Sequence, residues 1–267
     1  MNKLAKQLFA IVLSFFVLWF LLSRIDWVGI FKVKEATNKT EQKIGDLYVE
    51  MIQQNETVIE IDSLIQPIVD IIDQIKKANN IDSDIKLYVL DKDEINAFAI
   101  PNDNLVLFSG LINDCQSPEE LAGVIGHEIA HMEKNHVMKK LVKEVGLSVL
   151  VSMASGGNGT IIKETFKTLT SSAYDRKLES EADLTSVKYL KKADIDFRPF
   201  AEFLFRLSLD DSKHQKHLQI LSSHPGSEDR ATSILEENKN YAEVTRPIMP
   251  NEKWISLQDS FQEHISY

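Results

Sequence analysis

The stretch "SPEELAGVIGHEIAHMEKNH", Ser117 to His136, begins with three separate signals for the start of a helix. Ser117 is a residue that commonly caps a helix N-terminus, and Pro118 stands at the first helical position, where its missing N–H costs nothing. Glu120, three residues after the cap, completes a capping box. The sequence therefore predicts a helix that begins at Pro118.

Two histidines lie four residues apart in this helix. Such residues are about 40° apart around the helix axis, so His127 and His131 project from one face and can bind a single metal ion. Glu128 can then reach a metal-bound water without taking a ligand position. This is the H-E-x-x-H arrangement of zinc metallopeptidases, in which the glutamate is the general base. The neighbours of Glu128 in the sequence are apolar. An ionised glutamate among them is costly to bury without a charge partner such as a cation.

A catalytic zinc site needs a third protein ligand and an open position. His136 is nine residues past His127, so on one continuous helix it would lie on the opposite side. We therefore expect His136 to be structural or solvated.

A second predicted helix, in "AYDRKLESEADLTSVKYL" (Ala173 to Leu190), carries more suitable candidates. Glu179 and Asp183 are four residues apart on one face, and Glu181 is two positions off that face. A carboxylate from this helix would complete a His₂Glu site. Taken alone, the same pattern is also typical of an ordinary charged helix face.

The rest of the chain reads as α+β, mostly helical with a small sheet. Isoleucines at helical spacing between residues 32 and 80 predict two helices with a break near Asn55 or Asp62. Short strands are predicted at 85–91, 94–99 and 105–109, the last two joined by a turn at 101–104, which gives a small antiparallel sheet. After the glycine-rich residues 155–159, helices are predicted at 161–170, 174–192 and 198–209. The sequence after residue 241 has no clear pattern.

Composition limits the classes of function. The 267 residues are 43% hydrophobic, enough for one sizeable packed domain. Lys and Arg number 30 against 40 Asp and Glu, a net charge of -10 without a basic run, which argues against a nucleic-acid partner. Cys115 is the only cysteine, so an intramolecular disulfide and a cysteine-ligated zinc site are both excluded.

The N-terminus predicts attachment to a membrane. Lys3 and Lys6 precede an uncharged apolar run from Leu8 to Leu22. Fifteen helical residues span about 22 Å, short of a bilayer core of about 30 Å, which suits a signal-peptide core or a short anchor. No small-x-small cleavage site follows, and Arg24 and Trp27 stand at interface-like positions. We therefore expect an uncleaved anchor with its N-terminus in the cytoplasm.

Four blocks in one order resemble metallopeptidase family forty-eight. They are "INAFAIPNDNLVLFSGLI" (Ile95 to Ile112), the histidine helix, "YDRKLESEADLTSVKYL" (Tyr174 to Leu190) and "SSHPGSEDR" (Ser222 to Arg230). The family includes the CAAX prenyl proteases, the HtpX membrane proteases and the BepA-type periplasmic proteases, and the resemblance covers roughly residues 60 to 240. It implies a gluzincin fold, with a small sheet packed on helices and one zinc ion per chain.

The resemblance also assigns roles to single residues. Glu179 corresponds to the third zinc ligand, beside the two histidines of the first motif. Asp183 would orient a ligand histidine. His224 would lie near the metal, where it either stabilises the oxyanion or caps the zinc in a resting state. Arg230 would be structural.

Two positions depart from the usual family pattern. Asp175 stands where relatives usually have serine, before Arg176, and Ser186 stands where they usually have glycine. Neither is a proposed ligand, so they leave the subgroup open rather than the activity. The lack of several long apolar spans makes the chain resemble the BepA-like members more than the others.

Together these features predict a membrane-anchored zinc metalloendopeptidase. We expect it to hydrolyse unfolded or extended protein segments in extracytoplasmic quality control, with a substrate joining the edge of the strand "LVLFS" (Leu105 to Ser109). An alternative of another class is a latent or catalytically silent chaperone-like binding module, tethered to the membrane, with a structural zinc or a site held shut by His224. The sequence leaves the oligomeric state open.

The expected organisation has four parts. Residues 1–31 form a signal anchor, residues 32–80 a helical lead-in, residues 81–240 the catalytic domain and residues 241–267 a C-terminal tail. The expected location is the inner membrane of a bacterial-type cell, crossed once, with the catalytic domain on the periplasmic side.

Overall fold

The structure is a computed structural model that describes residues 33–157, 159–209, 219–239, 241 and 246–265. The predicted anchor, residues 1–31, lies outside this range. Within the described residues, no helix has both the length and the apolar character needed to cross a bilayer. The chain divides into two units after residue 41, and all elements from Gln42 onward belong to the second.

Three short strands form a mixed sheet in the order β1-β3-β2. They are β1 (Lys86–Leu90), β2 (Ala97–Ile100) and β3 (Asn104–Phe108). β2 and β3 form the predicted antiparallel hairpin, with Ala97 opposite Leu107. The tight turn between them holds Asn102 and Asp103 at φ 68° and 55°, left-handed values that Asn and Asp tolerate better than most residues.

The prediction of an antiparallel sheet is wrong for β1, which runs parallel to β3. The segment after β1 carries the chain past β3 to the far edge, so β3 returns between its two predecessors in the same direction as β1. β3 is therefore paired on both sides. The prediction that a substrate joins the edge of Leu105 to Ser109 is wrong as well, because that strand has no free edge.

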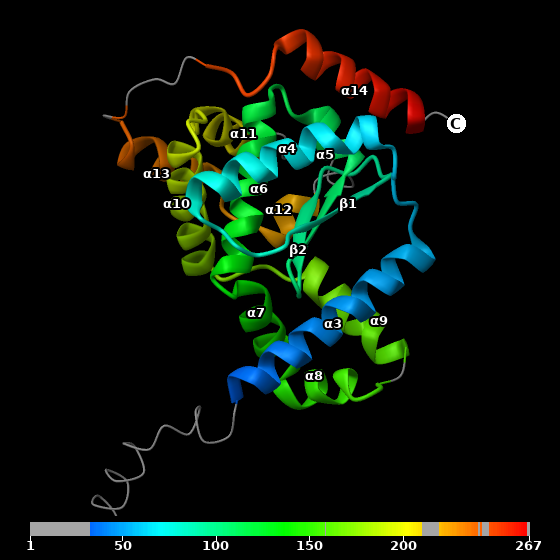
Figure 1. The fold of residues 1–267 in the computed structure, drawn as a ribbon. Coiled ribbons are helices and arrows are strands. Elements are labelled where there is room, and N and C mark those ends of the chain that lie inside the picture. Colours follow the sequence, from blue (N-terminus) through cyan, green and yellow to red (C-terminus); the bar gives the residue numbers. More distant parts are fainter. Residues whose placement is uncertain (1–32, 158, 210–218, 240, 242–245, 266–267) are drawn as a thin grey trace, which may run out of the picture. The chain divides into compact units, whose positions relative to one another are not determined.

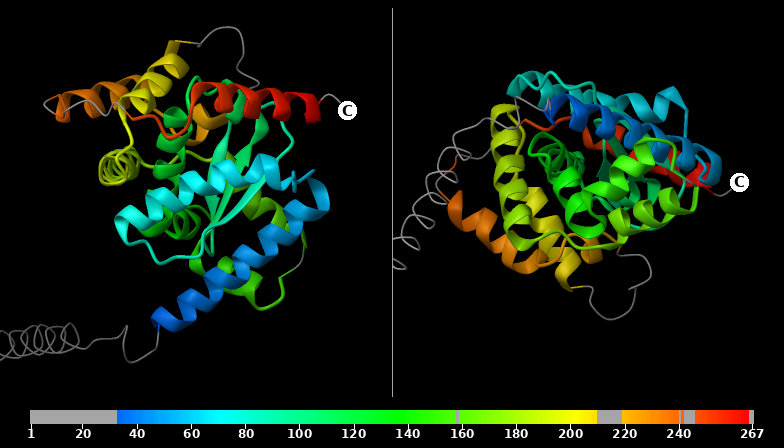
Figure 2. Two further views of the ribbon diagram at one scale, coloured as in Figure 1. Left: turned by 45° about the horizontal axis from the view of Figure 1, so that its top comes forward. Right: turned by 90° about the horizontal axis from the view of Figure 1, so that it is seen from below.

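Twelve helices of the described residues surround this sheet (Figures 1 and 2). They are α3 (Val33–Asn55), α4 (Asp62–Asn79), α5 (Ser109–Asp114), α6 (Pro118–Glu133), α7 (His136–Val145), α8 (Leu147–Ala154), α9 (Gly159–Ser171), α10 (Arg176–Lys192), α11 (Arg198–Leu209), α12 (Gln219–Ser223), α13 (Ser227–Glu237) and α14 (Asn251–Ile265). The predicted break between residues 55 and 62 is confirmed. The helices predicted at 161–170, 174–192 and 198–209 are also present, with small shifts of their ends.

The sheet separates two apolar cores. Along β3, Leu105 and Leu107 point into one core, which α4, α6, α10, α11 and α14 complete. Val106 and Phe108 point into the other, against α3, α7, α8 and α9. Both faces of the strand are covered, and every residue of β3 is buried.

The C-terminal helix α14 was not evident from the sequence. Trp254 and Phe261 are seven residues apart on it and almost fully buried in the first core. The Trp254 indole N–H donates to the carbonyl oxygen of Cys115 at 3.4 Å. The segment after residue 241 therefore contributes to the core that also holds α6.

The start of α6 follows the prediction. Ser117 has an extended backbone, and its hydroxyl accepts a hydrogen bond from the backbone N–H of Glu120 at 3.3 Å. The Glu120 carboxylate accepts from the N–H of Gln116 rather than from that of Ser117, and it also pairs with Arg206 at 2.6 Å. The N-terminus of α6 is thus bound both to the preceding loop and to α11.

Small residues allow α6 to pack closely against α10 and α11. A Cβ at Gly126 would meet the Ser186 hydroxyl at 2.7 Å, and one at Gly123 would meet the Phe200 Cβ at 2.2 Å. The Ser186 hydroxyl donates to the carbonyl oxygen of Gly123 at 3.0 Å. Serine at position 186 is therefore accommodated by glycine on the facing helix, and the histidines of α6 come close to the carboxylates of α10.

Candidate active site

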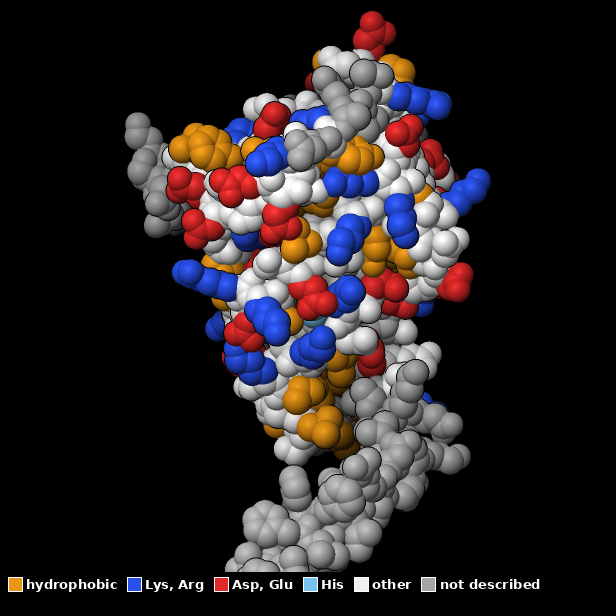
Figure 3. Space-filling view, turned by 90° about the vertical axis from the view of Figure 1, so that its left-hand side faces the viewer, with side chains coloured by type: hydrophobic (Ala, Val, Ile, Leu, Met, Phe, Trp, Pro, Cys, Tyr) orange, Lys and Arg blue, Asp and Glu red, His pale blue; other side chains and the backbone are white. Residues whose placement is uncertain are grey.

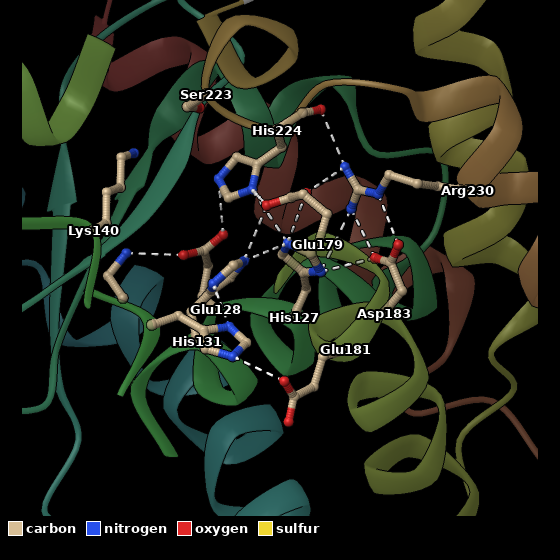
Figure 4. A network of polar contacts seen from close by, with 12 residues as sticks. His127, Glu128, His131, Lys140, Glu179, Glu181, Asp183, Ser223, His224 and Arg230 are labelled. Atoms are coloured by element: carbon tan, nitrogen blue, oxygen red, sulfur yellow. Dashed lines mark hydrogen bonds and ion pairs between the residues drawn. The ribbon is translucent and has the colours of Figure 1, made fainter. Parts of the chain in front are cut away.

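Four buried side chains from three segments meet beside β2 (Figure 4). His127 and His131 come from α6, Glu179 from the first turns of α10, and His224 from the residue after α12. One donor atom from each lies within 4.8 Å of all the others. The sequence had singled out all four, and the structure brings them together.

The donor atoms are crowded around one point. The Nε2 atoms of His127 and His131 are 3.0 Å apart, and the Nδ1 of His224 lies 3.2 Å from His127 Nε2. An oxygen of Glu179 lies 3.0 Å from His224 and 3.3 Å from His131. Imidazole nitrogens and a carboxylate oxygen at this spacing are the donor set that zinc prefers, so the residues present fit that ion.

Glu128 lies beside the cluster, between His224 and Ala99 of β2. One carboxylate oxygen, Oε2, accepts a hydrogen bond from the backbone N–H of Ala99 at 2.9 Å. The other, Oε1, lies 3.5 Å from His224 Nε2, and neither of these two atoms has a hydrogen-bond partner among the described residues. One half of the carboxylate is therefore anchored, and the other half is available for proton transfer.

Asp183 and Arg230 form hydrogen bonds and ion pairs with residues of the cluster. The Nδ1–H of His127 donates to Asp183 at 2.9 Å, which leaves Nε2 of the same ring directed at the cluster. Arg230 donates two hydrogen bonds of 2.7 Å to Asp183 and pairs with Glu179 at 2.8 Å. It also donates to the carbonyl oxygen of His224 at 3.1 Å. Arg230, expected to be structural, thus connects α13 to Glu179 and Asp183 of α10.

These contacts shift the pKa values of the buried groups. Burial raises the pKa of Asp183, but the charge and hydrogen bonds of Arg230 outweigh it and lower the pKa to about 2. Burial also raises the pKa of Glu179, and the charges of His224 and Arg230 with the hydrogen bonds of the histidines bring it well below its usual range. Both carboxylates are therefore held ionised.

The two ligand histidines are shifted in opposite directions. Burial lowers the pKa of His131 well below its usual value, so this ring is held neutral, as a metal ligand must be. Burial also lowers the pKa of His127, but the hydrogen bond that His127 donates to Asp183 and the charges of Asp183 and Glu179 outweigh it, and the net pKa is raised.

The predicted position of His136, on the opposite side of one helix, is wrong. α6 ends at Glu133, and Asn135 adopts a left-handed conformation with φ 55°, so the chain turns before α7 begins. The turn brings buried His136 back to the site, where its Nδ1 lies 3.1 Å from the Nδ1 of His131. Its Nε2 lies 3.5 Å from Glu181, the carboxylate placed off the ligand face of α10. The position was mispredicted because one continuous helix was assumed. The expectation that His136 is structural, and not the third metal ligand, stays a prediction.

Two further residues were missed. The Tyr174 ring stacks on His131, with centroids 4.1 Å apart and 29° between planes. Lys140 is buried, with its Nζ 4.0 Å from the centroid of that tyrosine ring, and donates to the carbonyl oxygen of Leu169 at 2.8 Å. Burial lowers the pKa of Lys140 to about 8. Nothing in the local pattern distinguishes this lysine from its exposed neighbour Lys139.

The site is closed to solvent in this structure. His127, Glu128, His131, Glu179 and His224 are each at most 3% exposed. The face that carries α10 and α13 shows acidic and basic side chains interspersed, with almost no histidine surface between them (Figure 3). A protein substrate can reach the cluster only if covering segments move.

A helix with H-E-x-x-H, a glutamate from a second helix and an anchored carboxylate beside both define a metallopeptidase site. Comparison with known proteins agrees, because the model of peptidase family M48 matches residues 62–238. The chain belongs to this family.

The curated relatives are proteases. A putative beta-barrel assembly-enhancing protease of Vibrio cholerae is 29% identical over 81% of this chain and 48% of its own length. The beta-barrel assembly-enhancing protease of Escherichia coli is 28% identical over 78% and 45%. The mitochondrial metalloendopeptidase OMA1 of Bos taurus is 31% identical over 55% and 31%. The chain thus spans at most about half the length of these relatives.

Proposed function

We propose that the chain is a membrane-anchored endopeptidase that cleaves unfolded or extended protein segments, with zinc held by His127, His131 and Glu179 and with Glu128 as general base. The observation that carries the proposal is the half-anchored carboxylate of Glu128. Its Oε2 is held by the Ala99 N–H, while Oε1 lies 3.5 Å from Nε2 of His224, one of the four clustered residues.

Each residue then has a defined task. Zinc, when bound, supplies the Lewis acid that activates water and polarises the scissile carbonyl. Glu128 Oε1 accepts a proton from the attacking water and returns it to the leaving amine, a role that contributes about 10² to 10⁴ in rate. Asp183 keeps the proton of His127 on Nδ1, away from the metal. His224 can donate from Nε2 to the oxyanion, which contributes about 10² to 10³.

The strand that presents substrate to this machinery is β2 in our proposal. Within the described residues, β2 pairs with β3 on one side only, and its other edge faces Glu128. An extended peptide that added to this edge would lie beside the base and the ligand cluster. Main-chain hydrogen bonds depend little on the side chains of the peptide, so this mode of binding suits unfolded segments of varied sequence.

The membrane attachment and the location are also proposals. They rest on the apolar run from Leu8 to Leu22, and on relatives named for beta-barrel assembly and for mitochondria. We propose a single-pass anchor at 1–31, a helical lead-in at 32–80, a catalytic domain at 81–240 facing the extracytoplasmic side and a tail at 241–267. A role in extracytoplasmic protein quality control fits this arrangement.

The contacts of His224 support a second candidate function, that of a binding module whose protease site is latent. His224 Nδ1 is as close to His127 and Glu179 as a fourth ligand would be, at 3.2 and 3.0 Å. A zinc ion with four protein ligands has no open position for water or substrate. In that state the protein would bind segments without cleaving them until His224 moved away.

One set of measurements separates these functions. Zinc per chain is measured by mass spectrometry on the purified protein, and casein cleavage is followed in parallel. If the protein is an endopeptidase, we expect one zinc per chain and weaker zinc binding in Glu179→Ala. We also expect Glu128→Gln to lose cleavage and retain zinc. Faster cleavage by His224→Ala would assign the capping role to His224, and slower cleavage the oxyanion role. Unchanged cleavage by Glu128→Gln would refute the proposed base.

A further inference from the structure

A large cavity lies on the other face of β2. It has a volume of about 710 Å³, within the range of ligand-binding pockets. Its walls are α3 and α9, side by side in Figure 1, and its floor is formed by the ends of the three strands. We call it the α3–α9 groove. The lining residues that the argument uses are Glu50, Met51, Phe98, Ile162, Lys163 and Phe166.

The floor of the groove is aromatic. The Phe98 ring makes edge contacts with Phe108 and Phe166, with centroids 5.9 and 6.0 Å apart. Half-buried Met51 lines the α3 wall and half-buried Ile162 lines the α9 wall. Such a surface favours apolar side chains, and a flexible methionine adapts to side chains of different shape.

The rims carry opposite charges. Exposed Glu50 lies on the α3 side and exposed Lys163 and Lys167 on the α9 side, while Lys92 is paired with Glu56 at 2.8 Å. A ligand with one strongly charged head, such as a fatty acid or a nucleotide, would meet repulsion from one rim. A polypeptide with apolar side chains and a neutral main chain fits both rims.

The groove and the candidate active site both adjoin strand β2. Side chains alternate between the two faces of a strand, and that of Phe98 points into the groove. The backbone N–H of the next residue, Ala99, points to the unpaired edge of β2, where Glu128 accepts its hydrogen bond. A peptide on that edge therefore passes within one residue of the groove. The α3 wall lies outside residues 62–238, the part that matches the family model, so the groove is not a feature of the matched domain alone.

We propose that the α3–α9 groove binds apolar side chains of extended polypeptides that lie along β2, and so selects substrates with apolar segments next to the cleaved bond. This inference rests on the proposed endopeptidase function and names its substrate class. It also gives α3, the first described helix, a role in recognition.

Binding is tested separately from cleavage. Full-length Glu128→Gln protein in lipid nanodiscs is titrated into two fluorescein-labelled peptides of equal length and charge, one rich in Leu and Phe and one with serine at those positions. Fluorescence anisotropy should give a Kd at least 10-fold lower for the apolar peptide. Adding Ile162→Lys or Met51→Lys should raise that Kd at least 10-fold. Ile255→Lys, a matched change on an exposed face of α14, should leave it unchanged.

The outcomes distinguish this inference from the proposed function. Equal binding of the two peptides, or an equal loss in all three lysine variants, would overturn the groove. Displacement of a lipid probe by oleate, with no peptide binding, would assign the groove to a lipid instead. If the peptides bind as expected but the protein with Glu128 intact cleaves neither, the endopeptidase proposal fails and the groove stands.

Discussion

Replacing Lys140 with methionine should stabilise the protein at neutral pH. Lys140 is 4% exposed, and burial lowers its pKa from the ordinary 10.5 to about 8. A difference of this size means that holding the ammonium inside the fold costs about 3 kcal/mol. Lys140→Met keeps the length and packing of the side chain and removes the charge, so the free energy of unfolding should rise by up to about 3 kcal/mol at pH 7.

The gain should depend on pH in one direction only. Between pH 8 and 10.5 the unfolded chain still holds the Lys140 proton, whereas the folded chain has lost it, so the stability of the unmodified protein rises with pH in this window. The advantage of Lys140→Met should therefore be full below pH 8 and fall to about 1 kcal/mol at pH 10.

Urea denaturation with a metal chelator, at pH 7 and pH 10, measures both values. Lys139→Met is the matched control, because Lys139 is exposed on the same helix and its replacement should change stability little at either pH. A variant less stable than the parent at pH 7, or a gain of the same size at pH 10, would refute the burial argument.

Four other substitutions test the remaining contacts. Asp183→Asn should weaken zinc binding about 10- to 100-fold in a chelator competition, and should remove stability that the parent has above pH 4 and loses toward pH 2. His136→Phe should also weaken zinc binding, since it removes the partner of His131, while far-UV circular dichroism stays unchanged. Arg230→Met should cost about 3–5 kcal/mol in urea unfolding, because it leaves two buried carboxylates without a cation. Gly123→Ala should cost about 1–3 kcal/mol, and less when combined with Phe200→Ala, which a double-mutant cycle would show.

Local patterns were enough to predict α6 and the way it presents its histidines. Capping residues and the i, i+4 spacing act within one helix, so Ser117, His127 and His131 could be placed without knowledge of distant contacts. Helical spacing made Glu179 a candidate, but the resemblance over four ordered blocks selected it and supplied His224. No local rule brings residues 97 positions apart, such as His127 and His224, to the same point.

The errors came from turns and from pairing between distant segments. The order of the strands depends on where the segment after β1 crosses, and that is decided by tertiary packing. The return of His136 depends on the left-handed conformation of Asn135, a residue type that often ends helices and that offered the available signal. The aromatic stack of Tyr174 and the burial of Lys140 follow from the packing of α7 against α9, which the sequence pattern does not reveal.

The hydrogen bond from Ala99 to Glu128 makes two events mutually exclusive. An amide carries one hydrogen, so a substrate carbonyl that pairs with Ala99 on the edge of β2 must displace the Glu128 carboxylate from it. Docking of a strand and anchoring of Glu128 Oε2 would then be a single competition for one donor. A peptide too short to reach Ala99 would leave Oε2 anchored, with Oε1 still available as the base.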